Sequence, residues 1–157
     1  EGGGDSEGPR PTIVVVNTNY WAQKFGNPAT DAFYSSYAQD LAGLVNVTQN
    51  HLHNERANGG GGGCVVLRTQ HDMIHGTTRE EDPRVNQHTH NVNAKIHEVG
   101  AQLSVPVFPW DAIFNEHLEE NIFDGWCHQW GDTSLYMMQR FTTWAAANLQ
   151  AECFLRR

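Results

Sequence analysis

The 157-residue chain has the composition of a single globular domain, with 39% hydrophobic and 10% aromatic residues, and a core of this size can bury most of its apolar surface. Its net charge of −8 excludes the basic surface that phosphate backbones require, so we expect no nucleic-acid partner. We also expect no membrane span, because no apolar run approaches the roughly 20 residues that one needs.

The first eleven residues are acidic and rich in glycine. They predict a disordered tail over 1–11 that leads into one domain over 12–157. The tail contains Gly4-Asp5-Ser6, the nucleophile signature of a large class of esterases. In that class the serine stands at a sharp turn between a strand and a helix. Because no strand precedes Ser6 and prolines follow it, we interpret the match as accidental and expect Ser6 to lie far from His128.

Apolar runs and helical patterns alternate along the rest of the chain. The runs predict strands at Thr12–Val16, Cys64–Leu67 and Val105–Phe108, the last interrupted by Pro106 as in a sheet edge. The patterns predict helices from about Pro28 to Leu52 with Asn27 as cap, from Val85 to Leu103, and from about Thr133 to Leu149 with Asp132 as cap. A polar loop is expected from His71 to about Arg84.

Strands that alternate with helices predict a three-layer α/β fold, in which helices flank a parallel sheet as in flavodoxin-like domains. Three strands are few for such a sheet, so the sequence indicates that a first strand–helix unit is missing. In these sheets ligands bind beyond the carboxyl ends of the strands. Polar residues follow each predicted strand at this edge: Asn17 and Asn19, then residues 68–72, then Asp111 and the loop 121–130.

The loop 121–130 brings an acid and a histidine close together in the sequence, Asp124 and His128, among Phe123, Trp126 and Trp130. An imidazole oriented by a carboxylate can take a proton from a hydroxyl and so act as a general base. The alternative is a loop whose aromatic side chains close one end of the core and leave His128 exposed.

The cysteines and histidines do not predict a metal site, and we expect no cofactor. Cys64, Cys127 and Cys153 lack the spacing of a metal or redox motif, and their odd count leaves at least one thiol unpaired. The pairs 51/53 and 88/90 among the nine histidines stand two residues apart, so on a helix they point to different sides. A glycosylation sequon at Asn46, inside a predicted helix, points towards a secretory lumen.

Four segments together resemble a known superfamily: 13–21 (IVVVNTNYW), 65–69 (VVLRT) with a histidine after it, 96–110, and 124–128 (DGWCH). They are similar to the C-terminal part of SGNH hydrolases, in particular the PC-esterase branch with the plant trichome-birefringence-like polysaccharide acetyltransferases. The resemblance implies a carbohydrate O-acyl esterase or O-acetyltransferase of the secretory pathway, in the Golgi lumen or outside the cell. It implies a glycan substrate and a Ser-His-Asp triad.

The resemblance also implies roles for single residues. His128 would be the general base, Asp124 would orient it, and Asn17 would donate its side-chain amide to the oxyanion. The pocket would be lined by Arg68 and His71. The tryptophans that would stack on sugar rings are Trp21, Trp126 and Trp130.

The chain departs from the family pattern in two ways. Its acid and histidine are spaced Asp-x-x-x-His instead of Asp-x-x-His, and the strand–serine–helix unit is absent. The serine would then come from a missing N-terminal part or from another subunit. The alternative function is a catalytically inactive, esterase-like module that binds glycan or has a structural role in a larger assembly.

Overall fold

The computed structural model describes residues 12–17, 30–72, 74–75, 78–79, 83–116, 131–149 and 153, and for 74–75, 78–79, 83–85, 115–116 and 131–134 it describes the backbone alone. The tail over 1–11 with Ser6, and the loop 121–130 with Asp124 and His128, lie outside these residues.

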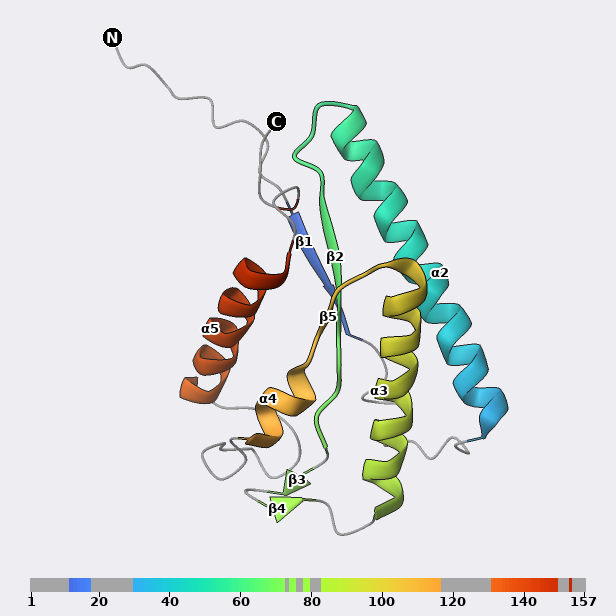
Figure 1. The fold of residues 1–157 in the computed structure, drawn as a ribbon, viewed down its shortest axis with the longest axis vertical. Coiled ribbons are helices and arrows are strands. Elements are labelled where there is room, and N and C mark those ends of the chain that lie inside the picture. The colour runs from blue at the N-terminus through green and yellow to red at the C-terminus, as the bar shows by residue number, and fades with distance from the viewer. Residues whose placement is uncertain are drawn as a thin grey trace.

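A three-stranded parallel sheet forms the centre of the domain (Figure 1). Its strands are β1 (Thr12–Val16), β2 (Gly63–Arg68) and β5 (Val107–Phe108), in the order β1-β2-β5. Val14 pairs with Val65, and Leu67 pairs with Val107. The three predicted strands and their parallel direction are therefore confirmed, with β5 beginning only after Pro106.

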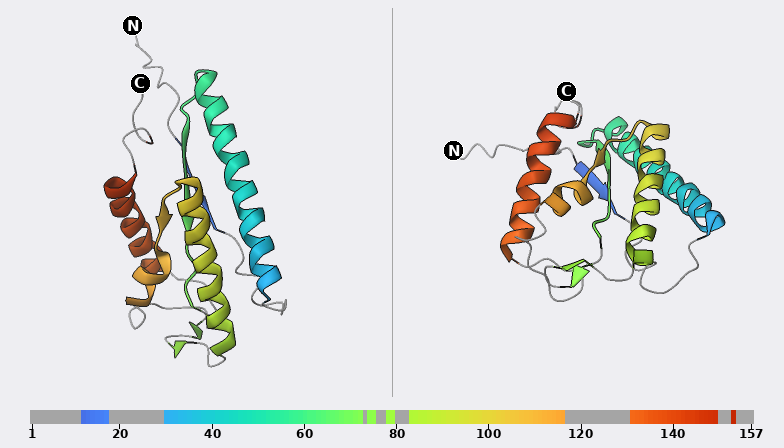
Figure 2. Two further views of the ribbon diagram at one scale, coloured as in Figure 1. Left: turned by 45° about the vertical axis from the view of Figure 1, so that its right-hand side comes forward. Right: turned by 60° about the horizontal axis from the view of Figure 1, so that its bottom comes forward.

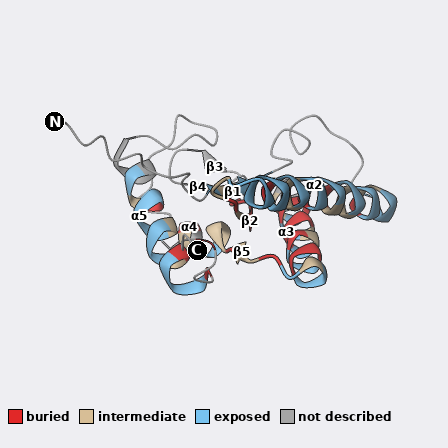
Figure 3. Cartoon of the chain, turned by 90° about the horizontal axis from the view of Figure 1, so that it is seen from above, coloured by how far each residue is buried: buried red, intermediate tan, exposed pale blue. Residues whose placement is uncertain are grey.

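Helices cover both faces of the sheet. α2 (Asp31–Ala57) and α3 (Pro83–Leu103) lie on one side, and α4 (Trp110–Glu116) and α5 (Gly131–Asn148) lie on the other (Figures 1 and 2). Seen from above, the buried faces of α3 and α5 turn towards the strands between them (Figure 3). This arrangement is the expected three-layer α/β fold.

Side chains that alternate along the strands build two separate cores, as the pleat of a strand requires. Val14, Val16 and Leu67 pack with α2 and α3 in the first core. Ile13 and Val66 pack with Phe108 and α5 in the second core. On α5 and just beyond it, Met137, Ala145 and Leu149 are buried, and Phe141 and Trp144 are partly buried.

The predicted helices are present, but two of their predicted caps are wrong. α2 begins at Asp31, not near Pro28, and its cap is Thr30, whose hydroxyl accepts a hydrogen bond from Phe33 N at 3.2 Å. The cap of α2 is therefore Thr30 and not Asn27, which lies outside the described residues. α5 begins at Gly131, so Asp132 stands inside the helix instead of capping it.

Two short elements were not predicted. The loop expected from His71 to Arg84 contains an antiparallel hairpin of β3 (Ile74–His75) and β4 (Thr78–Arg79). The seven-residue helix α4 starts directly after Pro109, whose carbonyl accepts from Ile113 N at 3.2 Å. Elements of this length show too few periods for a sequence pattern to reveal them.

Cys64 at the start of β2 and Cys153 beyond α5 form a disulfide across 89 residues of sequence. Cys127 lies outside the described residues. In the part of the chain that the structure describes, no helix has both the length and the apolar character needed to cross a membrane.

Candidate active site

Buried polar side chains gather at the carboxyl end of β2. The buried polar residues of the described chain fall in 69–72, directly after β2, and in 88–93, in the first turns of α3. A βα connection starts its helix at the carboxyl edge of the sheet, which is why the two segments meet. We call residues 68–72, His90, Asn93, Trp110 and Asp111 the carboxyl-edge cluster. Burying polar groups is costly unless they are hydrogen-bonded.

A network centred on Asn93 satisfies most of this buried polarity. The Asn93 amide bonds the backbone of Gln70 twice, accepting from Gln70 N at 2.8 Å and donating to Gln70 O at 2.7 Å. It also donates to one carboxylate oxygen of Asp111 at 3.1 Å, and the Thr69 hydroxyl donates to the other at 2.6 Å. Asp111 N in turn donates to the Thr69 hydroxyl oxygen at 3.1 Å. The network fixes the end of β2 against α3 and α4.

Thr69→Val removes the hydroxyl from the middle of this network and nearly keeps the shape of the side chain. We expect the free energy of unfolding to fall by about 1–3 kcal/mol, because at this partly buried position the Asp111 carboxylate loses a donor and the Asp111 backbone N–H loses its acceptor. The measurement is urea unfolding. The matched control is Thr142→Val on α5, where an exposed hydroxyl donates to Met138 O at 2.9 Å, and we expect a change of at most about 0.5 kcal/mol. Equal effects at both positions would contradict a stabilising role for the network.

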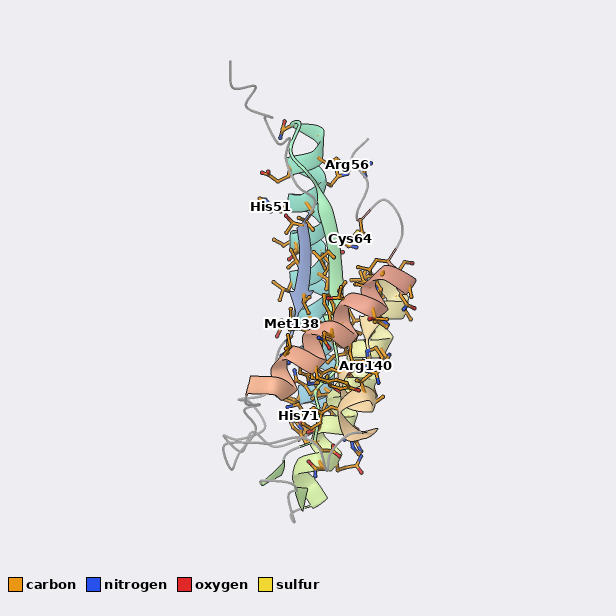
Figure 4. The ribbon with its side chains drawn as sticks, turned by 90° about the vertical axis from the view of Figure 1, so that its left-hand side faces the viewer. His51, Arg56, Cys64, His71, Met138 and Arg140 are labelled. Carbon is orange, nitrogen blue, oxygen red and sulfur yellow. A yellow bond between two sulfur atoms is a disulfide. The ribbon has the colours of Figure 1, made fainter. Side chains whose placement is uncertain are left out.

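His71 is held as a neutral imidazole at the base of the cluster. Its ring stacks on Phe114 with the centroids 4.3 Å apart, and Nδ1 donates to the carbonyl of Asp72 at 2.7 Å. Burial lowers the pKa of His71, more than its bond to Asp72 raises it. Figure 4 places His71 at the end of the sheet away from Arg56 and Cys64. The predicted site residue is therefore at the carboxyl edge, and its ring is neutral at pH 7.

Arg68 and Trp110 offer two buried donors at the same edge. The guanidinium carbon of Arg68 lies 4.3 Å from the centre of the Trp110 ring, a cation–π contact. Among the described residues, Arg68 Nε and Trp110 Nε1 are buried without a hydrogen-bond partner. Burial lowers the pKa of Arg68 to about 10, so the side chain stays positively charged at neutral pH. A bound ligand with oxygen acceptors would satisfy these donors.

Asp72 and His90 form an acid–imidazole pair that the sequence did not reveal. His90 Nε2 lies 2.9 Å from Asp72 Oδ1, and the exposed fraction is 3% for the Asp72 side chain and 55% for that of His90. A buried carboxylate on an accessible imidazole is the arrangement that a general base needs. The pair could have been predicted only from the order of the elements, because His90 lies in the first half of the helix that follows β2.

Asn17 lies at the same edge of the sheet as Arg68. Val16 is in register with Leu67, so Asn17, one residue further, reaches the level of Arg68, and it is exposed. Asn17 therefore lies at the edge where ligands bind in parallel sheets, as the strand order predicts. The other predicted site residues lie outside the described residues and stay predictions: His128, Asp124, Trp21 and Trp126.

Other histidines of the described chain form no metal centre. Within these residues no group of three or more His, Cys, Asp or Glu side chains could hold a metal ion. His51 and His53 are exposed on α2. His88 is buried between α2 and α3, where its Nδ1 lies 2.8 Å from the Tyr34 hydroxyl, and burial lowers its pKa.

Comparisons with protein-family models, curated proteins and solved structures find no match.

Proposed function

We propose that this chain is the C-terminal part of an SGNH-type carbohydrate O-acyl esterase or O-acetyltransferase. The observation that carries the proposal is the carboxyl-edge cluster: buried, ordered polar side chains and two buried donors at the edge of a parallel sheet where ligands bind in such folds. Perturbed ionisable groups that converge on one edge are typical of functional sites.

Each residue has a proposed role in acyl transfer. Asn17 donates its amide to the tetrahedral oxyanion, and His128, oriented by Asp124, removes the proton from a serine hydroxyl. Arg68 and Trp110 donate to oxygen atoms of the acyl group or the sugar, next to His71. Trp21 and Trp126 stack on sugar rings.

The serine comes from outside the described residues, on a strand–helix unit of a longer chain or of another subunit. The position of β1 supports this proposal. Among the described strands β1 pairs with β2 alone, so its second edge can accept one more parallel strand. Such a strand would end at the same carboxyl edge as Asn17.

The secretory pathway is the proposed compartment. The disulfide between Cys64 and Cys153 is of the kind that persists in oxidising compartments. Asn46, the sequon asparagine, is exposed on α2, so its side chain is accessible for glycosylation.

A second candidate is the inactive, glycan-binding module. It is favoured by the network among Thr69, Asn93 and Asp111, whose hydrogen bonds join the end of β2 to α3 and α4. This structural role is enough to explain why many of these polar side chains are buried. The extra residue between Asp124 and His128 favours it too.

A fluorophosphonate probe and an acetylated polysaccharide distinguish the two candidates in the natural full-length protein. We expect the probe to label one serine stoichiometrically, and acetate release from acetylated xylan to stop once that serine is labelled. Peptide mapping then locates the nucleophile. Binding to the polysaccharide with neither labelling nor acetate release would refute the enzyme and favour the inactive module.

A further inference from the structure

A cavity of about 780 Å³ lies at the amino end of the sheet, away from the carboxyl-edge cluster. It opens because β5 pairs with Leu67 and Arg68 at the end of β2, so among the described strands the first part of β2 has a neighbour on the β1 side alone. The last turns of α2 and α3 and the end of α5 surround the space. Its volume is in the range of small-molecule sites.

The inner walls of this cavity are apolar. They are formed by Leu52 of α2, Val65 of β2, Val105, Val107 of β5 and Leu149, together with the Cys64–Cys153 disulfide. Glycines allow the backbone to form part of the wall: a Cβ on Gly100 would lie 2.5 Å from Val107 Cγ2. The interior therefore suits the hydrocarbon part of a ligand.

Hydrogen-bond donors line the mouth of the cavity. His53 and Arg56 come from the last turns of α2, and His97 comes from α3. All three side chains are exposed. None of the described lining residues carries a carboxylate, although the whole chain has 18 acidic and 10 basic residues. The mouth therefore favours a negatively charged group.

Arg56 is not needed to complete its own helix. The final carbonyls of α2 are bonded by backbone N–H groups, from Asn58 to Asn54 O at 3.0 Å and from Gly59 to Arg56 O at 3.2 Å. In the part of the chain that the structure describes, the side chains of Arg56, His53 and His97 make no hydrogen bond or ion pair. Figure 4 shows Arg56 and Cys64 towards one end of the molecule and His71 towards the other.

We propose that this cavity binds a small amphipathic anion, a carboxylate or phosphate monoester on an apolar body. The hydrocarbon part lies against the wall of Val65 and Leu149, and the anionic group meets Arg56 and the two imidazoles at the mouth. The site is independent of the acyl-transfer proposal, because it lies at the opposite end of the strands.

Isothermal titration with decanoate, decyl phosphate and decan-1-ol tests the ligand class. We expect saturable one-to-one binding of at least one of the two anions, with decanol about tenfold weaker because it lacks the charge-assisted bonds. The tighter anion identifies the headgroup as carboxylate or phosphate. Absence of saturable binding by both anions, or equal binding of decanol, would overturn the proposal.

Two pairs of variants test the location. Ala101 and Ala94 are both exposed on α3, but only Ala101 lines the cavity. We expect Ala101→Trp to abolish anion binding and Ala94→Trp to leave it unchanged.

The second pair tests the charge at the mouth. Arg56→Gln should weaken the binding of the anions about tenfold and leave the binding of decanol unaffected. Arg140→Gln, on the exposed side of α5, should change the affinity for neither the anions nor decanol. Equal effects within either pair would show that binding occurs elsewhere. Esterase activity should survive Ala101→Trp, which separates this site from the acyl-transfer site.

Discussion

Replacing His128 with alanine is expected to lower acetate release from acetylated xylan by about 10²–10⁴-fold, because a positioned general base contributes a factor of that size. The assay uses the full-length protein with its nucleophile present. Asp124→Asn should also lower the rate substantially, because an amide no longer holds the imidazole in the tautomer that accepts the serine proton.

The described pair of Asp72 and His90 supplies the sharpest control for this experiment. The pair is an acid–imidazole contact at the same edge of the sheet, so it is the competing candidate for the base. We expect His90→Ala to keep the rate within a few-fold of the wild-type value. If His90→Ala abolished activity and His128→Ala did not, the base would be His90, and the assignment of Asp124 and His128 would be wrong.

The fold was predictable from the sequence because each strand of the sheet contains a short run of apolar residues, and in β1 all of them are β-branched. Val14 and Val16 face one core and Ile13 faces the other, so β1 has apolar side chains on both faces, as a covered parallel strand does. The start of α2 was not predictable in the same way. Asn27 and Thr30 are both good cap residues, and only the structure shows that it is Thr30 that bonds Phe33 N.

For the candidate site, the sequence predicted which edge of the sheet some residues occupy but not their hydrogen-bond partners. Arg68, His71 and Asn17 were expected at the carboxyl edge from strand order alone, since parallel strands end at the same side of a sheet. The bonds from Asn93 to Gln70 and from His90 to Asp72 span 23 and 18 residues. No local pattern encodes such partners, because they depend on how α3 packs beside the end of β2.

Asn17→Ala is expected to lower kcat for acetate release by about 10²–10³-fold, the usual cost of removing one oxyanion donor. KM should stay nearly unchanged, because the negative charge on the oxygen develops only in the transition state, so the amide gives little to substrate binding. Asn17→Asp should be at least as damaging, since its carboxylate repels the developing charge. The measurement is the dependence of the rate on substrate concentration for each variant.

A loss caused by misfolding can be separated from this effect. Asn17 is exposed just beyond the end of β1, so its replacement should change the free energy of unfolding by no more than about 0.5 kcal/mol. Asn50→Ala, at an exposed position on α2, is the matched control and should leave kcat unchanged. A rise in KM at constant kcat would instead make Asn17 a ground-state binding residue. Unchanged kinetics would remove it from the site, because an oxyanion donor that can be deleted without effect on kcat stabilises no transition state.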